Sequence, residues 1–317
     1  MKRKIALILL LVLVITGCQS GNNKENKLNI GILQYIEHPA LDSVREGFEE
    51  ELKDLGIDAK IDYQSAQGDI GVARTIAEKF SKDKVDLIFA IGTSAAQAAA
   101  SVTEDIPVIF SAVTNPVDAE LVESLEKPGK NVTGTTDKVD IEKQLNLFKE
   151  IDENIKTIGV VYSADEANSI AQISEIEEIG PKLGFKINAK SIQNISDLPQ
   201  VGQSVVKDSD GVYIISDNKI ASSISLLADL LIENMKPSVG AEEAHVEGGC
   251  LISDGISYNS LGKTSADMAK RILIDGEDPG NMKVESTEET IKKINMDTLK
   301  ALDLDSNLEV FKDGEEI

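Results

Sequence analysis

The pattern of hydrophobic and polar positions switches repeatedly between short apolar runs and apolar residues at helical spacing. Runs typical of strands cover residues 28–33, 57–63, 85–91 and 107–110. Helical spacing or an Ala-rich run predicts helices over residues 39–55, 70–80 and 93–100. Strands that alternate with helices in this order predict a parallel, doubly wound α/β sheet.

A second copy of this order begins near residue 156. In both copies the first apolar strand and the Leu-Gly that ends the first helix are 25 residues apart. A later strand begins near Asp86 in the first copy and near Asp210 in the second. Seven residues further on, at the end of that strand, lie Thr93 and Asp217. Any two α/β units share some features, but the equal spacing favours two similar lobes. The other matched positions are Ile30 with Ile158, Leu55 with Leu183, and Asp86 with Asp210.

The remaining chain is too short for a third domain. It predicts a strand at 249–253, a helix at 261–274 and a strand-and-helix segment from 284. We expect it to cross back between the lobes and form a multi-strand hinge. The expected N-terminal lobe is 28–137 plus 255–282, and the expected C-terminal lobe is 138–254 plus 283–317. Since ligands bind at the carboxyl ends of parallel strands, the cleft between the lobes is the expected site.

The first residues are typical of an export signal. A positive start at residues 2–4 precedes an apolar run at 5–15, which is shorter than the ~20 residues of a spanning helix. Thr16-Gly17-Cys18 then resembles a bacterial lipobox. We therefore expect a lipoprotein signal peptide (1–17), lipidation of Cys18 and a polar tether (18–27), which would place the protein on the extracytoplasmic face of the cell membrane. An ordinary secretory signal or a short membrane anchor are the alternatives.

Composition excludes several classes of protein. The 317 residues include 32 Lys and Arg against 55 Asp and Glu, a net charge of −23 that disfavours nucleic acid as a partner. Two Cys and two far-separated His, His38 and His245, cannot form a local zinc motif, so no metal site is expected. If Cys18 carries lipid, Cys250 has no disulfide partner, and its apolar neighbours predict a small buried hydrophobe.

Four polar loops follow the predicted strands and supply the candidate ligand-binding residues. Hydroxyls and free N–H groups at the start of the helix at Thr93 suit a carboxylate, whereas Asp217 and Asp254 suit an ammonium group. Together they predict a zwitterionic ligand, an amino acid. The alternatives are helix caps for Thr93, Thr114 and Asp217, and a turn for Asp254. The full set is Gln34, His38, Thr93, Ser94, Ala95, Ala112, Thr114, Ser163, Asn168, Ser169, Asp217, Asn218 and Asp254.

Common motifs of catalysis do not occur in the sequence. The chain has no GxSxG, no GxxxxGK[ST], no HExxH and no GxGxxG. We therefore expect a binding protein without a cofactor instead of an enzyme.

Several strings resemble solute-binding lipoproteins of ABC transporters, in the branch that includes tryptophan- and tyrosine-type receptors. The resemblance implies a type I periplasmic-binding fold. It also implies a monomer that clamps an amino acid between its lobes, with aromatic amino acids among the candidates, and delivers it to a permease with its ATPase. A binding lipoprotein that signals to a membrane receptor is the alternative, with a secreted enzyme or structural lipoprotein as a third class. The strings are residues 30–34, 38–42, 95–97, 114–117, 128–134, 168–169, 217–218 and 258–262.

Overall fold

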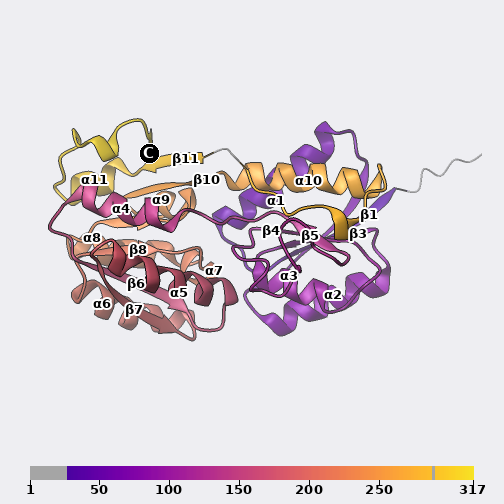
Figure 1. Cartoon of the computed structure of the whole chain (residues 1–317), viewed down its shortest axis with the longest axis horizontal. Coiled ribbons are helices and arrows are strands. Elements are labelled where there is room, and N and C mark those ends of the chain that lie inside the picture. Colours follow the sequence, from indigo (N-terminus) through magenta and orange to yellow (C-terminus); the bar gives the residue numbers. More distant parts are fainter. Residues whose placement is uncertain (1–26, 288–289) are drawn as a thin grey trace, which may run out of the picture.

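The computed structural model describes residues 27–287 and 290–317 and contains two lobes, each built around one sheet (Figure 1). The expected signal peptide, Cys18 and most of the tether lie outside the described residues. The predicted fold class, two α/β lobes with parallel sheets, is confirmed.

The N-terminal lobe has a five-stranded parallel sheet in the order β2-β1-β3-β4-β5. Helices α1 and α10 pack together against it, and α2 packs beside α3. Its elements are β1 (Leu28–Gln34), α1 (Pro39–Asp54), β2 (Ala59–Ser65), α2 (Ile70–Asp83), β3 (Leu87–Ile91), α3 (Thr93–Ala100), β4 (Val108–Ser111), β5 (Val132–Gly134), α10 (Tyr258–Leu273) and the 3-10 turn η2 (Pro279–Asn281).

The C-terminal lobe repeats this order around a seven-stranded sheet, β12-β11-β10-β9-β8-β6-β7, in which β11 is antiparallel to β10. Its elements are α4 (Ile141–Ile151), β6 (Thr157–Ser163), α5 (Ala167–Lys182), β7 (Lys186–Ile192), η1 (Ile195–Asp197), α6 (Leu198–Lys207), β8 (Gly211–Ile214), α7 (Asn218–Ala221), α8 (Ile224–Glu233), β9 (Ser238–Gly240), α9 (Glu243–Glu247), β10 (Ile252–Ile256), β11 (Thr290–Ile294), α11 (Met296–Ala301), η3 (Glu309–Phe311) and β12 (Glu315–Glu316).

The internal repeat is visible in single hydrogen bonds. The Asp86 carboxylate accepts a bond of 2.7 Å from the N–H of Asn29, at the start of β1. Asp210 accepts a bond of 2.8 Å from the N–H of Thr157, at the start of β6. These Asp residues therefore serve the same structural purpose in both lobes, as their matched spacing suggests.

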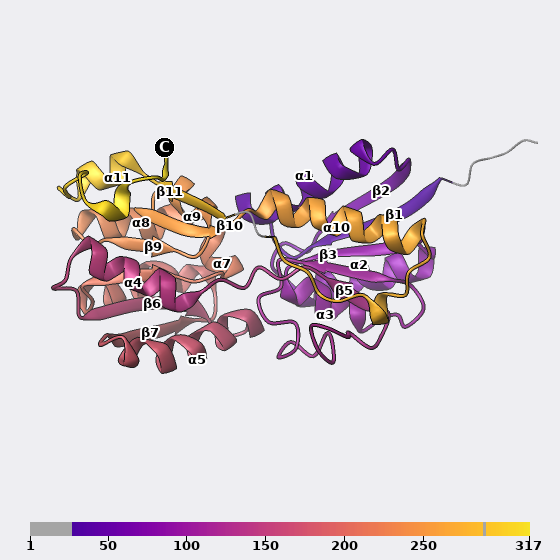
Figure 2. The same ribbon diagram turned by 45° about the horizontal axis from the view of Figure 1, so that its top comes forward.

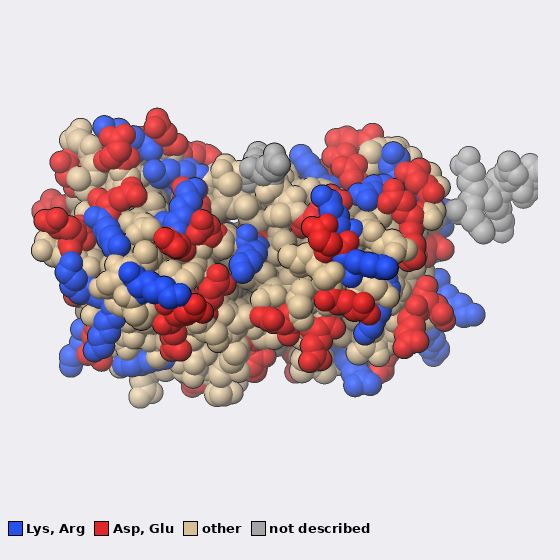
Figure 3. Space-filling model, viewed as in Figure 1, with Lys and Arg blue, Asp and Glu red and all other residues tan. Residues whose placement is uncertain are grey.

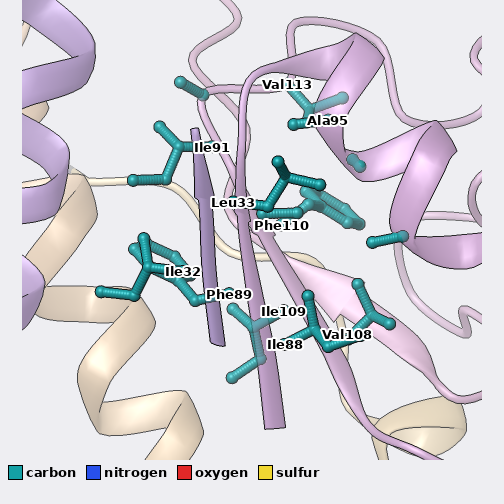
Figure 4. Packing of buried hydrophobic residues seen from close by; sticks show 14 of the residues in the cluster. Ile32, Leu33, Ile88, Phe89, Ile91, Ala95, Val108, Ile109, Phe110 and Val113 are labelled. Carbon is teal, nitrogen blue, oxygen red and sulfur yellow. The ribbon is translucent and has the colours of Figure 1, made fainter. Parts of the chain in front are cut away.

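The centre of the N-terminal lobe is packed on both faces of its sheet (Figure 4). Ile32, Leu33, Phe89 and Phe110 are fully buried, and the ring of Phe48 stacks on Phe89 with 3.9 Å between centroids. Burial of each such side chain contributes about 1.5–3 kcal/mol. Strands buried on both faces explain why their sequences read as continuous apolar runs.

The C-terminal part of the chain crosses between the lobes. Strand β10 belongs to the C-terminal sheet, whereas α10 lies along α1 in the N-terminal lobe (Figures 1 and 2). A Cβ at Gly262 would lie 2.0 Å from the carbonyl oxygen of Val44, so only glycine permits this approach of the two helices. A parallel bridge between Thr135 and Glu285 pairs two of the crossing segments. Lobes joined in this way can rotate about a hinge.

Candidate functional site

A closed cavity lies between the lobes, where the strands of both sheets end. The free volume inside it is about 10 Å³, which is room for about one water molecule. Both lobes and the crossing segments contribute to its lining. The lining residues are His38, Leu41, Ala112, Thr114, Asp137, Asn168, Ser216, Asp217, Asn218, Glu242 and Tyr258.

Asp217 lines this cavity, but its own lobe occupies its carboxylate. Oδ1 accepts bonds from Ser163 Oγ (2.8 Å) and the N–H of Ile220 (3.0 Å). Oδ2 accepts bonds from the N–H of Ser163 (2.6 Å) and Ser169 Oγ (2.7 Å). Asp217 is thus the N-cap of α7, and its four donors fix the strand ends of the C-terminal lobe.

Other acceptors around the cavity have no hydrogen-bond partner among the described residues. Asp137 accepts a bond of 2.7 Å from the Tyr258 hydroxyl on Oδ2, while its Oδ1 is unpaired. Asn168 Oδ1 is also buried without a hydrogen bond, and Glu242 Oε1 has the imidazole Nε2 of His245 3.1 Å away. Buried polar groups are usually satisfied, so the unpaired oxygens indicate a ligand that donates hydrogen bonds.

The charges of the lining residues are negative. Burial alone would raise the pKa of Glu242, but the imidazole of His245, 3.1 Å away, lowers it to about 2. Burial raises the pKa of Asp137 to about 6, and burial lowers the pKa of His38, which keeps this imidazole neutral. The lining includes carboxylates and no Lys or Arg, whereas on the surface in Figure 3 both charges are interspersed. The cavity therefore suits a cationic group.

One side-chain pair connects the two lobes across the cleft. His38 is the N-cap residue of α1, but its side chain makes no capping bond, and Pro39 follows it. Its Nε2 lies 3.3 Å from Oδ1 of Asn218, the first residue of α7. Asn218 in turn donates from Nδ2 to Glu166 Oε2 at 2.6 Å.

The structure places six of the predicted residues in the cavity lining: His38, Ala112, Thr114, Asn168, Asp217 and Asn218. The other predicted residues of the N-terminal lobe are buried close to it. Gln34 braces its loop by donating to Ile36 O and Asp42 Oδ1. Thr93, Ser94 and Ala95 begin α3, and the Thr93 hydroxyl is unpaired, so it does not cap that helix.

In the C-terminal lobe, Ser163 and Ser169 lie behind Asp217 as its donors. Asp254 does not lie at a strand end, contrary to our expectation. The predicted strand at 249–253 is in fact β10 at Ile252–Ile256, so Asp254 lies within it and pairs with Lys143 at 2.8 Å. The strand end is instead next to Tyr258, which does line the cavity.

The set of predicted ligand-binding residues did not include five lining residues: Leu41, Asp137, Ser216, Glu242 and Tyr258. Asp137 lies in the segment already expected to join the lobes. Glu242 follows β9, whose three residues are too short to give a strand pattern. Cys250 is buried, as predicted, and burial raises its pKa to about 12, so its thiol is unreactive.

No helix in the ranges 27–287 and 290–317 is long and apolar enough to cross a membrane. Among the same residues, no group of His, Cys, Asp and Glu side chains could hold a metal ion.

Two lobes that enclose a small polar cavity define a periplasmic-type binding protein, and comparison with known proteins identifies its family. Residues 29–317 match the model of the ABC transporter substrate binding protein family, and the chain belongs to this family. The predicted family is confirmed, and the transport role is favoured over the signalling alternative.

Three relatives are informative. The "Tyrosine-binding protein" of Clostridioides difficile (strain R20291) is 41% identical over 308 residues, 92% of this chain and 89% of that protein. The ABC domain from Streptococcus pneumonia in complex with L-Trp is 31% identical, with a TM-score of 0.87 over 92% of this chain and 99% of that one. A ligand-free, open substrate-binding protein with adhesive properties from Clostridium difficile is 41% identical, with a TM-score of 0.71 over the same shares.

These scores indicate which conformation the structure represents. The open structure has the higher sequence identity, 41% against 31%, yet the lower TM-score, 0.71 against 0.87. Sequence divergence would give the opposite order, so the difference reflects the arrangement of the lobes. The present structure is thus more similar in lobe arrangement to the L-Trp complex than to the open, ligand-free structure, consistent with its enclosed cavity.

Proposed function

We propose that this chain is the receptor of an ABC importer for an amino acid, with L-tyrosine or L-tryptophan as the first candidates. One observation carries the proposal: the closed interlobe cavity is lined by carboxylates and by no Lys or Arg, and Asp137 Oδ1 and Asn168 Oδ1 in this lining have no hydrogen-bond partner among the described residues. A buried anion without a partner is costly, so a ligand that brings a cation stabilises the closed form.

The donors at each carboxylate assign the ammonium group. Asp217 has four donors from its own lobe. Asp137 Oδ1 has no donor among the described residues, and Glu242 Oε1 has a single close neighbour there, His245 Nε2 at 3.1 Å. We therefore place the ammonium at Asp137 and Glu242, with Asp217 organising the loops beside them.

The other parts of an amino acid find complementary groups nearby. Thr93, Ser94 and Thr114 are the proposed donors for the carboxylate, and the unpaired Thr93 hydroxyl supports this. Leu41, Ala112 and Tyr258 supply apolar surface for a side chain. The names of the two relatives, one tyrosine-binding and one in complex with L-Trp, support an aromatic side chain.

A thermal-shift screen against the twenty amino acids tests this proposal. A ligand at 100 times its Kd adds ~2.7 kcal/mol of stability. We expect tyrosine or tryptophan to raise Tm most, followed by saturable binding in titration calorimetry. No shift with any amino acid would refute the amino-acid assignment.

We further propose that the receptor acts as a monomer outside the cytoplasm, held by lipid on Cys18, and passes its ligand to a permease driven by an ATPase. The membership of an importer family and the lipobox-like Thr16-Gly17-Cys18 support this. The variant Cys18→Ala should abolish acylation and membrane retention. A variant that stays membrane-bound with a normally processed N-terminus would contradict lipid anchoring.

A further inference from the structure

Glu166, Asn218 and His38 form a row of hydrogen bonds, and this row fixes which groups donate and which accept at the cavity. Glu166 Oε2 accepts bonds from the Asn218 N–H (3.2 Å) and Asn218 Nδ2 (2.6 Å). Since the Asn218 amide points its Nδ2 at Glu166, its Oδ1 faces His38 Nε2 at 3.3 Å. An amide oxygen only accepts, so Nε2 must carry the proton.

That assignment determines the other ring nitrogen. A neutral imidazole protonated on Nε2 has a lone pair on Nδ1. His38 is 5% exposed and lines the cavity, and Nδ1 has no hydrogen-bond partner among the described residues. His38 thus adds a neutral acceptor to a lining that also contains the carboxylates of Asp137 and Glu242.

We propose that Glu166 and Asn218 are positioning residues that hold His38 as its Nε2–H tautomer, so that Nδ1 accepts a hydrogen bond from the ligand's ammonium group when the lobes close. This inference rests on the proposed amino-acid ligand. It adds a physical link between binding of that ligand and closure of the two lobes. Asn218 and His38 belong to different lobes, so opening the cleft separates the pair and releases the tautomer.

The arrangement holds in both protonation states of Glu166. Burial, and next the charge of Asp217, raise the pKa of Glu166 to about 8. Among the described residues, Oε1 accepts only the Lys219 N–H, at 3.2 Å, whereas Oε2 also accepts a bond from Asn168 Nδ2 at 3.4 Å. A proton would therefore reside on Oε1 and leave Oε2 as the acceptor for Asn218.

The chain has two His, so ¹⁵N-histidine NMR can report the tautomer of the His38 imidazole directly. The variant His245→Gln assigns the signals. The probes are L-tyrosine, tyramine, which lacks the carboxylate, and 3-(4-hydroxyphenyl)propionate, which lacks the ammonium. With L-tyrosine and tyramine, we expect Nδ1 of His38 to stay unprotonated and to shift as it accepts a bond. The propionate should leave it unshifted. A His38 protonated on Nδ1 in the L-tyrosine complex would overturn the proposal.

Variants separate positioning from general damage. Glu166→Leu should mix the His38 tautomers and weaken L-tyrosine binding about 3- to 10-fold, the range of a lost neutral hydrogen bond. Glu166→Gln keeps an acceptor and should restore the wild-type tautomer. His38→Phe should cost about 10- to 150-fold, as for a bond to a charged donor. The neighbouring Asp165→Asn, whose carboxylate pairs with Lys219 outside the cavity lining, is the matched control.

The outcomes distinguish the two proposals. If none of the three probes binds, the choice of ligand is wrong, and the spectra are recorded instead with the amino acid that raises Tm most in the thermal-shift screen. In that closed complex, Glu166→Gln must show the wild-type tautomer and Glu166→Leu a mixture. Identical His38 spectra in all variants would refute the positioning claim even if L-tyrosine binds tightly.

Discussion

Two groups of buried acids face the same cavity and differ in their hydrogen bonds. Asp217 receives four donors from its own lobe. Asp137 and Glu242 have fewer donors: among the described residues, Asp137 Oδ1 has none, and Glu242 Oε1 has His245 Nε2 at 3.1 Å. Asp217, whose carboxylate is fully hydrogen-bonded, holds the fold together. Asp137 and Glu242 have acceptor capacity left for a ligand. Burial and position alone therefore do not identify a binding residue, whereas free acceptor capacity does.

The largest effect should come from replacement of Asp217, and it should be on stability. Asp217→Ala leaves the buried donors of Ser163, Ser169 and Ile220 without an acceptor, which should cost about 3–5 kcal/mol of unfolding free energy. Chemical denaturation would measure this. A variant as stable as the parent that has lost only ligand binding would reverse the comparison and make Asp217 the ammonium partner.

Neutralising Glu242 should instead weaken ligand binding. Glu242→Gln removes a charged acceptor from the proposed ammonium, worth about 1.5–3 kcal/mol, or about 10- to 150-fold in Kd. Titration calorimetry with L-tyrosine measures it. The neighbouring Glu243→Gln is the control, because Glu243 pairs with Lys293 at 3.1 Å and does not line the cavity. Equal affinities for the two variants would be inconsistent with the assignment.

Asp137 should make affinity depend on pH. Burial raises its pKa from 3.8 to about 6 in the folded protein, so the folded state binds more protons than the unfolded state between these values. Stability of the ligand-free closed form should therefore fall as pH rises from about 4 to about 6. A bound ammonium favours the carboxylate, so L-tyrosine should bind about tenfold more weakly at pH 5 than at pH 7.5. Asp137→Asn should flatten this profile, and an equally steep profile in that variant would assign the proton elsewhere.

The smallest effect is expected at Asp254. Its partner Lys143 is 53% exposed, and such ion pairs contribute about 0–1 kcal/mol. Lys143→Ala should change Tm little and leave Kd for L-tyrosine unchanged. A large loss of affinity would place Asp254 in the site after all.

The sequence was most informative where structure is local or repeated. The helix predicted at 93–100 is α3 to the residue, and the spacing that matched Asp86 with Asp210 corresponds to equivalent hydrogen bonds. The strand end at Tyr258 was missed because the apolar run before it also fits a register three residues earlier. Nor could the sequence reveal that Asp217 is saturated, since its donors Ser163 and Ser169 are about fifty residues away.

The most direct test of the central claim is a crystal structure of the protein with L-tyrosine. The account predicts a closed cleft with the ligand nitrogen within hydrogen-bond distance, about 2.7–3.2 Å, of Asp137 Oδ1 or Glu242 Oε1, while Asp217 keeps its four internal donors. A ligand nitrogen bound to Asp217, or a ligand outside the cavity, would contradict it.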